Sequence, residues 1–203
     1  MKCTRIDLDS WDRGKLFQFY INNMRLTVEI SVTPLDAYIK DHHLKFYPSM
    51  LWVVSRVINA HDEFKYSWDE KGHLIKWDSV SPSYADFHQE DQNFTKLVTE
   101  YSDDLFEFLA DRERYKNARA VMERQPPNFF DASCLPWVRY QHFDVHVFDE
   151  GKFLAPVVTW GKYEREHGEL MMPLTMNIHH AVADGFHLSR FFNEVQEVIN
   201  SLS

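Results

Sequence analysis

The sequence predicts a mixed α/β fold in which a β-sheet is covered by helices. Several stretches alternate apolar and polar residues, which is typical of strands, and others repeat apolar residues at helical spacing. The two kinds of segment do not alternate regularly along the chain, which favours a mixed sheet over a repeated strand–helix–strand design. No linker, repeat or low-complexity segment interrupts the 203 residues. We therefore expect one domain over residues 1–203.

The first third of the chain contains three expected helices and one strand. Residues 11–20 follow Ser10, a good N-cap, and carry apolar residues at helical spacing. Residues 25–33 alternate as a half-buried strand does. Residues 34–43 fit a second helix. Residues 48–58 fit a third, with proline in the first turn and no clear polar face, so this helix should be buried.

The middle of the chain predicts a hairpin, a helix and a loop. Residues 65–68 and 73–77 are rich in aromatic and β-branched residues, and the turn residues 69–72 separate them. Residues 92–113 are expected to be helical. Residues 124–132 contain two prolines and an asparagine and are expected to form a loop.

The last third predicts three strands and a terminal helix. Residues 134–148, 154–162 and 169–178 hold Val, Phe, Leu or Met in near-alternation. Residues 186–202 show the clearest helical pattern of the sequence. The apolar positions of this helix are Phe186, Leu188, Phe191, Phe192, Val195, Val198, Ile199 and Leu202.

The composition excludes some classes of protein. The net charge is −9 and no basic cluster is present, which argues against a nucleic-acid partner. Cys3 and Cys134 are too few for a disulfide framework and lack the spacing of a metal site. The N-terminus has no apolar signal segment, and no run of 18 apolar residues could span a membrane. The default expectation is a cytoplasmic enzyme or binding domain.

The most informative motif is the stretch His179-His180-Ala181-Val182-Ala183-Asp184-Gly185. A histidine is the usual proton carrier near neutral pH, although most of the eleven histidines must be surface or packing residues. Because neighbours in a strand point to opposite faces, one histidine can pack while the other faces a cleft. His180 is the candidate base, Asp184 can anchor the loop, and Gly185 permits a sharp turn.

This motif resembles the active-site motif of the chloramphenicol acetyltransferases, within the wider coenzyme A-dependent acyltransferase superfamily. The resemblance covers nearly the whole chain, because further segments match in the same order. They are Trp11–Arg13, Phe17–Tyr20, Lys45–Pro48, Trp77–Val80, Phe87–Glu90, Ser133–Val138, Phe153–Pro156 and Gly161–Tyr163. The resemblance implies the CoA-dependent acyltransferase fold, a two-layer sandwich of a mixed sheet and helices.

The resemblance also implies a reaction and a set of catalytic roles. His180 would be the general base that takes the proton from the primary hydroxyl of chloramphenicol, which then attacks acetyl-CoA directly in a ternary complex. Ser133 would donate a hydrogen bond to the tetrahedral oxyanion, and Thr159 would support the same intermediate through water. Asp184 and Arg13 would form a buried ion pair that shapes the loop. Without the resemblance, Ser133 would be an ordinary strand residue.

Binding residues follow from the same resemblance. The implied acceptor pocket is apolar and aromatic, and its positions are Phe19, Tyr20, Met24, Phe87, Phe94, Phe143, Val145 and Val147. Trp137 and Tyr163 match positions near the coenzyme A channel. Taken one by one, without the resemblance, such apolar residues fit a plain core better than a binding pocket. The family implies acetyl-CoA as co-substrate, no metal, a homotrimer with active sites between subunits, and a role in antibiotic resistance.

The sequence departs from the family pattern at a few positions. Ala85 stands where a threonine is usual, Asp131 where an asparagine is usual, and Ala183 where a cysteine is usual, and the loop around 115–130 is short. The first two bear on the acceptor, so a related enzyme acting on another small alcohol is the main alternative. A non-catalytic relative is a second alternative. A coenzyme A-independent hydrolase is a third, for which no Gly-x-Ser-x-Gly elbow is present.

Overall fold

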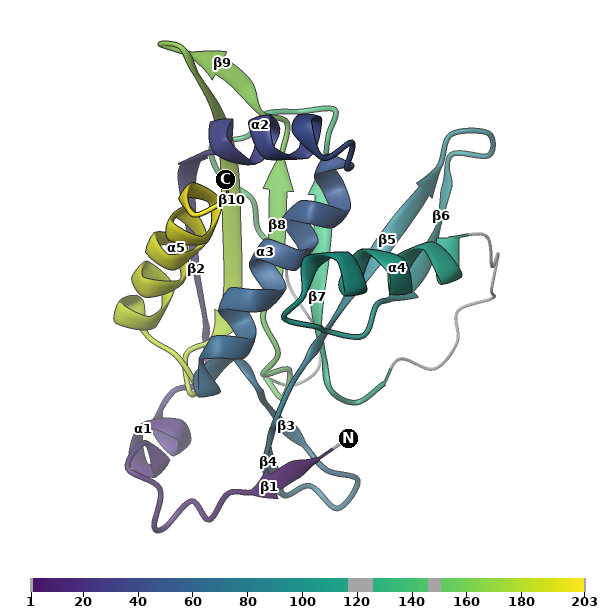
Figure 1. The fold of residues 1–203 in the computed structure, drawn as a ribbon. Helices are drawn as coiled ribbons and strands as arrows, with labels where there is room; N and C mark the ends of the chain where they lie inside the picture. Colours follow the sequence, from purple (N-terminus) through teal and green to yellow (C-terminus); the bar gives the residue numbers. More distant parts are fainter. Residues whose placement is uncertain (1, 117–125, 146–150, 203) are drawn as a thin grey trace.

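The computed structural model describes residues 2–116, 126–145 and 151–202. A large mixed sheet is covered on one face by helices, and a small second sheet lies at one end (Figure 1). This confirms the predicted fold class. Within the described residues, no helix is long and apolar enough to cross a membrane.

The large sheet combines parallel and antiparallel neighbours. Its central strand β7 is parallel to both of its neighbours, whereas every other pair is antiparallel. A seventh strand, β9 (Glu164–Glu166), pairs with β10. The order of the other six across the sheet is β2 (Asn23–Ser31), β10 (Glu169–His179), β8 (Val157–Gly161), β7 (Phe129–Leu135), β5 (Ser81–His88) and β6 (Asn93–Val98).

Helices α3 (Phe46–Ala60) and α5 (Gly185–Asn200) bury apolar residues against one face of this sheet. The central helix α3 is buried along most of its length, as its lack of a polar face predicts. Helix α5 lies beside it (Figure 1). This helix buries a stripe that runs from Leu188 to Ile199. The remaining helices are α1 (Gly14–Phe19), α2 (Thr33–Asp41) and α4 (Leu105–Lys116).

The small sheet contains the predicted hairpin. Strands β3 (Tyr66–Trp68) and β4 (Leu74–Trp77) pair in antiparallel register, and β1 (Cys3–Arg5) adds to the outer side of β4. A short 3-10 turn, η1 (Asp62–Phe64), connects α3 to β3.

The two faces of the large sheet differ in chemistry. On β10, Leu174, Met176 and Ile178 belong to the apolar core under the helices. The intervening residues Thr175 and Asn177 point to the opposite face, because side chains alternate along a strand. Both are nevertheless buried, since residues 136–145 lie over this face, where the hydroxyl of Tyr140 donates to the carbonyl of Thr159 at 2.7 Å.

Two predictions about the middle of the chain are wrong. Residues 92–113 do not form one helix, because 93–98 form strand β6, which pairs with β5, and only the part from Leu105 onward is helical. Phe94 and Lys96 lie on one face of β6 and Thr95 on the other, a period of two that favours a strand. Strand β5 itself was not predicted, and neither was β1.

The strand and loop predicted around residue 134 are also misplaced. Strand β7 covers Phe129–Leu135, so it begins inside the expected loop and ends where the long strand was expected to begin. Pro136 follows at once, and proline cannot donate a backbone hydrogen bond to a ladder. Residues 136–145 form no strand, and 146–148 lie outside the described residues. The strands expected at 154–162 and 169–178 are confirmed by β8 and β10.

Candidate active site

His180 lies in the turn that joins β10 to α5. Its backbone N–H donates to the carbonyl of Asn22 at 2.8 Å, which fastens the turn to the start of β2. The N–H of Val182 then donates to the carbonyl of His179 at 3.1 Å, and α5 begins at Gly185. The predicted passage from strand through loop to helix is therefore confirmed.

The two adjacent histidines have different surroundings. His179 is buried, with 5% of its surface exposed, and its Nδ1 accepts from the backbone N–H of Ala181 at 3.2 Å. His180 is only half-buried. The geometry agrees with the prediction that one histidine packs and the other is accessible.

The imidazole of His180 stacks on Tyr20. The ring centroids are 3.6 Å apart and the planes differ by 29°. Burial lowers the pKa of His180, and the positive charge of Arg13 lowers it further, against a smaller opposing influence of Asp184. A lowered pKa keeps the imidazole neutral at pH 7, and only the neutral ring can accept a proton.

Arg13 holds the turn at three points. Its Nε donates to the carbonyl of Ala181 at 2.6 Å, and its Nη2 donates to the carbonyl of His180 at 2.9 Å. Its Nη1 pairs with the carboxylate of Asp184 at 3.2 Å. The Arg13 side chain is 14% exposed and that of Asp184 37%, so the pair is partly exposed in the single chain. The predicted ion pair is present, and it fixes the backbone that carries His180.

Asp184 also begins helix α5. Its side chain accepts the backbone N–H of Phe186 at 3.0 Å, which is the N-cap bond that aspartate commonly makes. Burial would raise the pKa of Asp184, but the hydrogen bond from Arg13 and the charge of His187 lower it overall. The carboxylate is therefore ionised and joins the loop to the helix.

His187 completes this N-cap, and our sequence reasoning did not identify it. Its Nδ1 lies 2.8 Å from Oδ1 of Asp184 and 3.1 Å from the backbone nitrogen of the same residue. A protonated Nδ1 donates to the carboxylate, whereas an unprotonated Nδ1 accepts the N–H. The sequence signal was available, because His187 stands three residues after the N-cap, where a capping box places its second side chain.

Ser133 and Thr159 are neighbours on adjacent strands. Ser133 on β7 is opposite Thr159 on β8, and Thr159 is opposite Thr175 on β10, so the three share the sheet face away from the helices. The structure thus brings the two predicted oxyanion residues together. His179 lies four residues beyond Thr175 on the same strand, which is about 13 Å at ~3.3 Å per residue. Within one chain, His180 is therefore distant from Ser133.

The predicted acceptor residues divide into groups at different places. Phe19 is 75% exposed, while Tyr20 and Met24 are half-buried. Met24 lies near Gly185, because a Cβ atom added to this glycine would be 4.0 Å from the terminal methyl group of Met24. These residues belong to the His180 end of the sheet. Phe87 and Phe94 form an exposed cross-strand pair at the opposite edge.

The other predicted acceptor residues lie over the face that bears Thr159. Phe143 packs on Tyr140 with ring centroids 5.6 Å apart. Val145 lines a very small cavity beside Asn177 and His179. Val147 lies outside the described residues. One chain therefore does not assemble the whole predicted pocket.

The predicted coenzyme A residues lie near the far end of β7 and β8. Trp137 is 63% exposed and packs edge-on against Phe87, with ring centroids 4.9 Å apart. Tyr163 packs against Phe46 at 4.8 Å. The backbone N–H of Lys162 donates to the carbonyl of Val138 at 2.9 Å, so the segments that carry the two predicted residues are joined.

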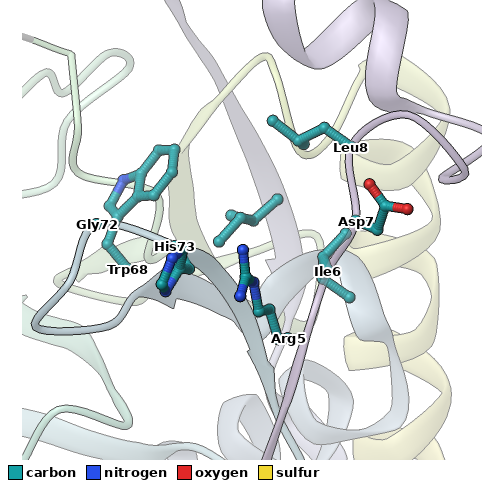
Figure 2. A pocket seen from close by; sticks show the side chains of 8 residues that line it. Arg5, Ile6, Asp7, Leu8, Trp68, Gly72 and His73 are labelled. Carbon is teal, nitrogen blue, oxygen red and sulfur yellow. The ribbon is translucent and has the colours of Figure 1, made fainter.

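Among the described residues, we find no second active site in the cavities, the cysteines or the metal-ligating side chains. A cavity of about 480 Å³ lies beside the small sheet, with Arg5, Trp68 and His73 around it, and none of the predicted site residues line it (Figure 2). Burial raises the pKa of the Cys134 thiol to about 12, so it is not a thiolate nucleophile at pH 7. Residues 2–116, 126–145 and 151–202 contain no cluster of three or more His, Cys, Asp or Glu side chains suited to a metal.

Comparison with solved structures identifies the fold. A chloramphenicol acetyltransferase structure matches with a TM-score of 0.88 over 98% of this chain and 100% of that chain, at 23% identity. A dihydrolipoamide acetyltransferase from Azotobacter vinelandii matches with a TM-score of 0.68 over 92% of this chain and 85% of that chain, at 16% identity. The fold is that of the coenzyme A-dependent acyltransferases.

Sequence comparison narrows the class to one family. The family model described as chloramphenicol acetyltransferase matches residues 1–196. A chloramphenicol acetyltransferase of Clostridium butyricum is 37% identical over 208 residues, which cover 98% of this chain and 95% of the relative. The chain belongs to the chloramphenicol acetyltransferase family, whose members are acyltransferases.

Proposed function

We propose that this protein transfers an acetyl group from acetyl-CoA to the primary hydroxyl of chloramphenicol. The observation that carries the proposal is the state of His180, a half-buried imidazole with a lowered pKa, stacked on Tyr20 and carried by a turn that Arg13 clamps. This is the arrangement that a general base near neutral pH requires. Membership of the chloramphenicol acetyltransferase family supports the choice of both substrates.

The proposed reaction is a direct transfer within a ternary complex. The neutral imidazole of His180 takes the hydroxyl proton while the alcohol oxygen forms a bond to the thioester carbonyl carbon. Ser133 donates a hydrogen bond to the resulting oxyanion, and Thr159 on the neighbouring strand supports it through water. The carbon–sulfur bond then breaks, and the proton held by His180 goes to the departing thiolate. The products are the acetyl ester and free coenzyme A.

The distances within one chain support an active site shared between subunits. His180 follows the end of β10, whereas Ser133 lies in the middle of the sheet, with one strand between β7 and β10. Because the base must reach the hydroxyl that attacks the thioester, and the oxyanion donor must reach the carbonyl oxygen of the same thioester, His180 of one chain has to meet Ser133 of another. We propose a homotrimer with three such sites, each chain being a single catalytic domain over residues 1–203. A cytoplasmic location and the absence of a metal stay predictions.

A different small alcohol is the second candidate acceptor. The observation in its favour is that Asp131, two residues before Ser133 on the same strand, forms an ion pair with Lys96. A charged pair beside the acceptor is unfavourable for an apolar ligand. A non-catalytic relative is disfavoured, because Arg13, Asp184 and Tyr20 all support the accessible His180.

The release of coenzyme A thiol tests the proposal. The protein is incubated with acetyl-CoA and chloramphenicol, and the free thiol is followed with a thiol reagent. We expect release that depends on chloramphenicol and is absent without it. Release only with other primary alcohols would favour the second candidate, and no release with any alcohol would refute the assignment.

A further inference from the structure

Lys96 reaches across strand β5 to pair with Asp131. Strand β5 lies between β6, which carries Lys96, and β7, which carries Asp131 (Figure 1). Nζ of Lys96 is 2.5 Å from Oδ1 of Asp131. On β5, Lys96 is opposite Ala85 and Asp131 is opposite Ser83. The methyl group of Ala85 leaves room for the long lysine side chain to cross the strand.

The ion pair lies on the same sheet face as the proposed oxyanion donor. Ser133 follows Asp131 by two residues on β7, so both side chains point to one face. The last pair of the β5–β7 ladder is Tyr84 opposite Ala132. Ala85 on β5 and Ser133 on β7 each follow this pair by one residue. The lysine side chain, which crosses β5 at Ala85, therefore lies beside Ser133. A ligand that reaches Ser133 therefore lies near the pair.

The pair is partly accessible and has unused hydrogen-bonding capacity. The side chains of Lys96 and Asp131 are 23% and 28% exposed in the single chain. Among the described residues, the ammonium group of Lys96 has one hydrogen-bond partner, Asp131, and an ammonium group carries three N–H donors. An acceptor molecule that covers the pair must satisfy these groups or remove them from water at a cost.

We propose that Lys96 and Asp131 determine acceptor specificity, and that they favour a primary alcohol with a hydrogen-bonding group facing the pair over an acceptor with only apolar surface there. This inference rests on the proposed function, because the site is placed by the role of Ser133. Ala85 contributes by its small size. Two of the positions at which the sequence departs from the family pattern, 85 and 131, are thus connected through one lysine.

A double substitution tests the inference. Lys96→Met with Asp131→Asn keeps the size of both side chains and removes both charges. We expect the KM and the directly measured Kd for chloramphenicol to fall about tenfold, because replacing a pair that a ligand must desolvate recovers about 1.4 kcal/mol. The KM for acetyl-CoA should stay within twofold. The matched control is Lys40→Met with Asp36→Asn, a pair of the same type at 2.6 Å on α2, which should leave both constants unchanged.

The outcomes separate this inference from the proposed function. An unchanged or higher Kd for chloramphenicol in the folded double variant overturns the specificity role. Calorimetry measures the Kd for chloramphenicol even if the native protein releases no thiol. The Kd therefore tests the specificity role, and thiol release tests the proposed reaction. If the double variant does not fold by circular dichroism, Lys96→Gln with Asp131→Asn replaces it, and the same fall in Kd is expected.

Discussion

At the scale of single residues, the proposed acetyl transfer depends on the protonation state of His180. Because burial and Arg13 lower its pKa from the usual value of about 6.5, the ring is neutral at pH 7 and becomes cationic only at more acidic pH. We expect kcat/KM for acetyl transfer to be constant near pH 7 and to fall on acidification, with a midpoint below 6.5. A pH–rate profile measures this, and a midpoint above 6.5 would contradict the assigned environment.

Ser133 gives a second prediction at this scale. In the proposed reaction its hydroxyl donates to the oxyanion, which exists only in the transition state and the intermediate. We therefore expect Ser133→Ala to lower kcat by about 10²–10³ and to leave KM nearly unchanged. Steady-state kinetics with chloramphenicol and acetyl-CoA separate the two constants. A change confined to KM would show that Ser133 binds a substrate in its ground state instead.

The sequence pointed to His180 and Asp184 through the His179–Gly185 motif and to Arg13 through the family resemblance. The contacts among these residues depend on the fold. Arg13 and Asp184 are 171 positions apart, and the structure unites them at the turn. Lys96 and Asp131 are 35 positions apart and sit on strands either side of β5. The Lys96–Asp131 ion pair depends on the register of β5 with β6 and on its register with β7. Because β5 was not predicted, the ion pair could not be inferred from the sequence.

At the scale of elements, periodicity predicted the terminal helix well and the weakly apolar strands poorly. The terminal helix was evident from its apolar stripe, and α5 buries that stripe. Strand β5 begins Ser81-Pro82-Ser83, which has neither the β-branched residues nor the alternation of a typical strand. It becomes a strand because Tyr84 is fully buried under the helices and because β6 and β7 pair on both sides.

The N-cap of α5 supplies a prediction at the scale of one helix. His187→Ala removes the side chain that contacts the carboxylate and the backbone nitrogen of Asp184. We expect the free energy of unfolding to fall by about 1 kcal/mol. His187→Gln should restore most of it, because glutamine at this position completes a capping box. Chemical denaturation measures both variants.

A matched comparison separates capping from the clamp on the active-site turn. Asp184→Ala removes the cap and also leaves the guanidinium of Arg13 without its carboxylate. We expect a larger loss of stability than in His187→Ala, together with a lower kcat, because the carbonyl of His180 is held by the same guanidinium. Equal effects of the two substitutions would show that the ion pair does not support the turn.

At the scale of the whole molecule, one chain carries the proposed base and the proposed oxyanion donor at separate places on the sheet. The fold explains this separation, because His180 follows the end of β10 and Ser133 lies in the body of the sheet. Neither the apolar content nor the aromatic content of the sequence could predict it. Only the strand registers place the two residues apart, and this separation is the basis for the proposal that a second chain completes the site.

Subunit complementation tests whether the active site is shared between two chains. We expect the variants His180→Ala and Ser133→Ala each to be nearly inactive alone. Co-expressed with different affinity tags and purified as mixed trimers, they should recover about one third of the native activity, because a closed ring of two kinds of subunit contains one interface with both native residues. Thiol release from acetyl-CoA with chloramphenicol measures it. Mixed trimers no more active than the better single variant would contradict a site shared between subunits.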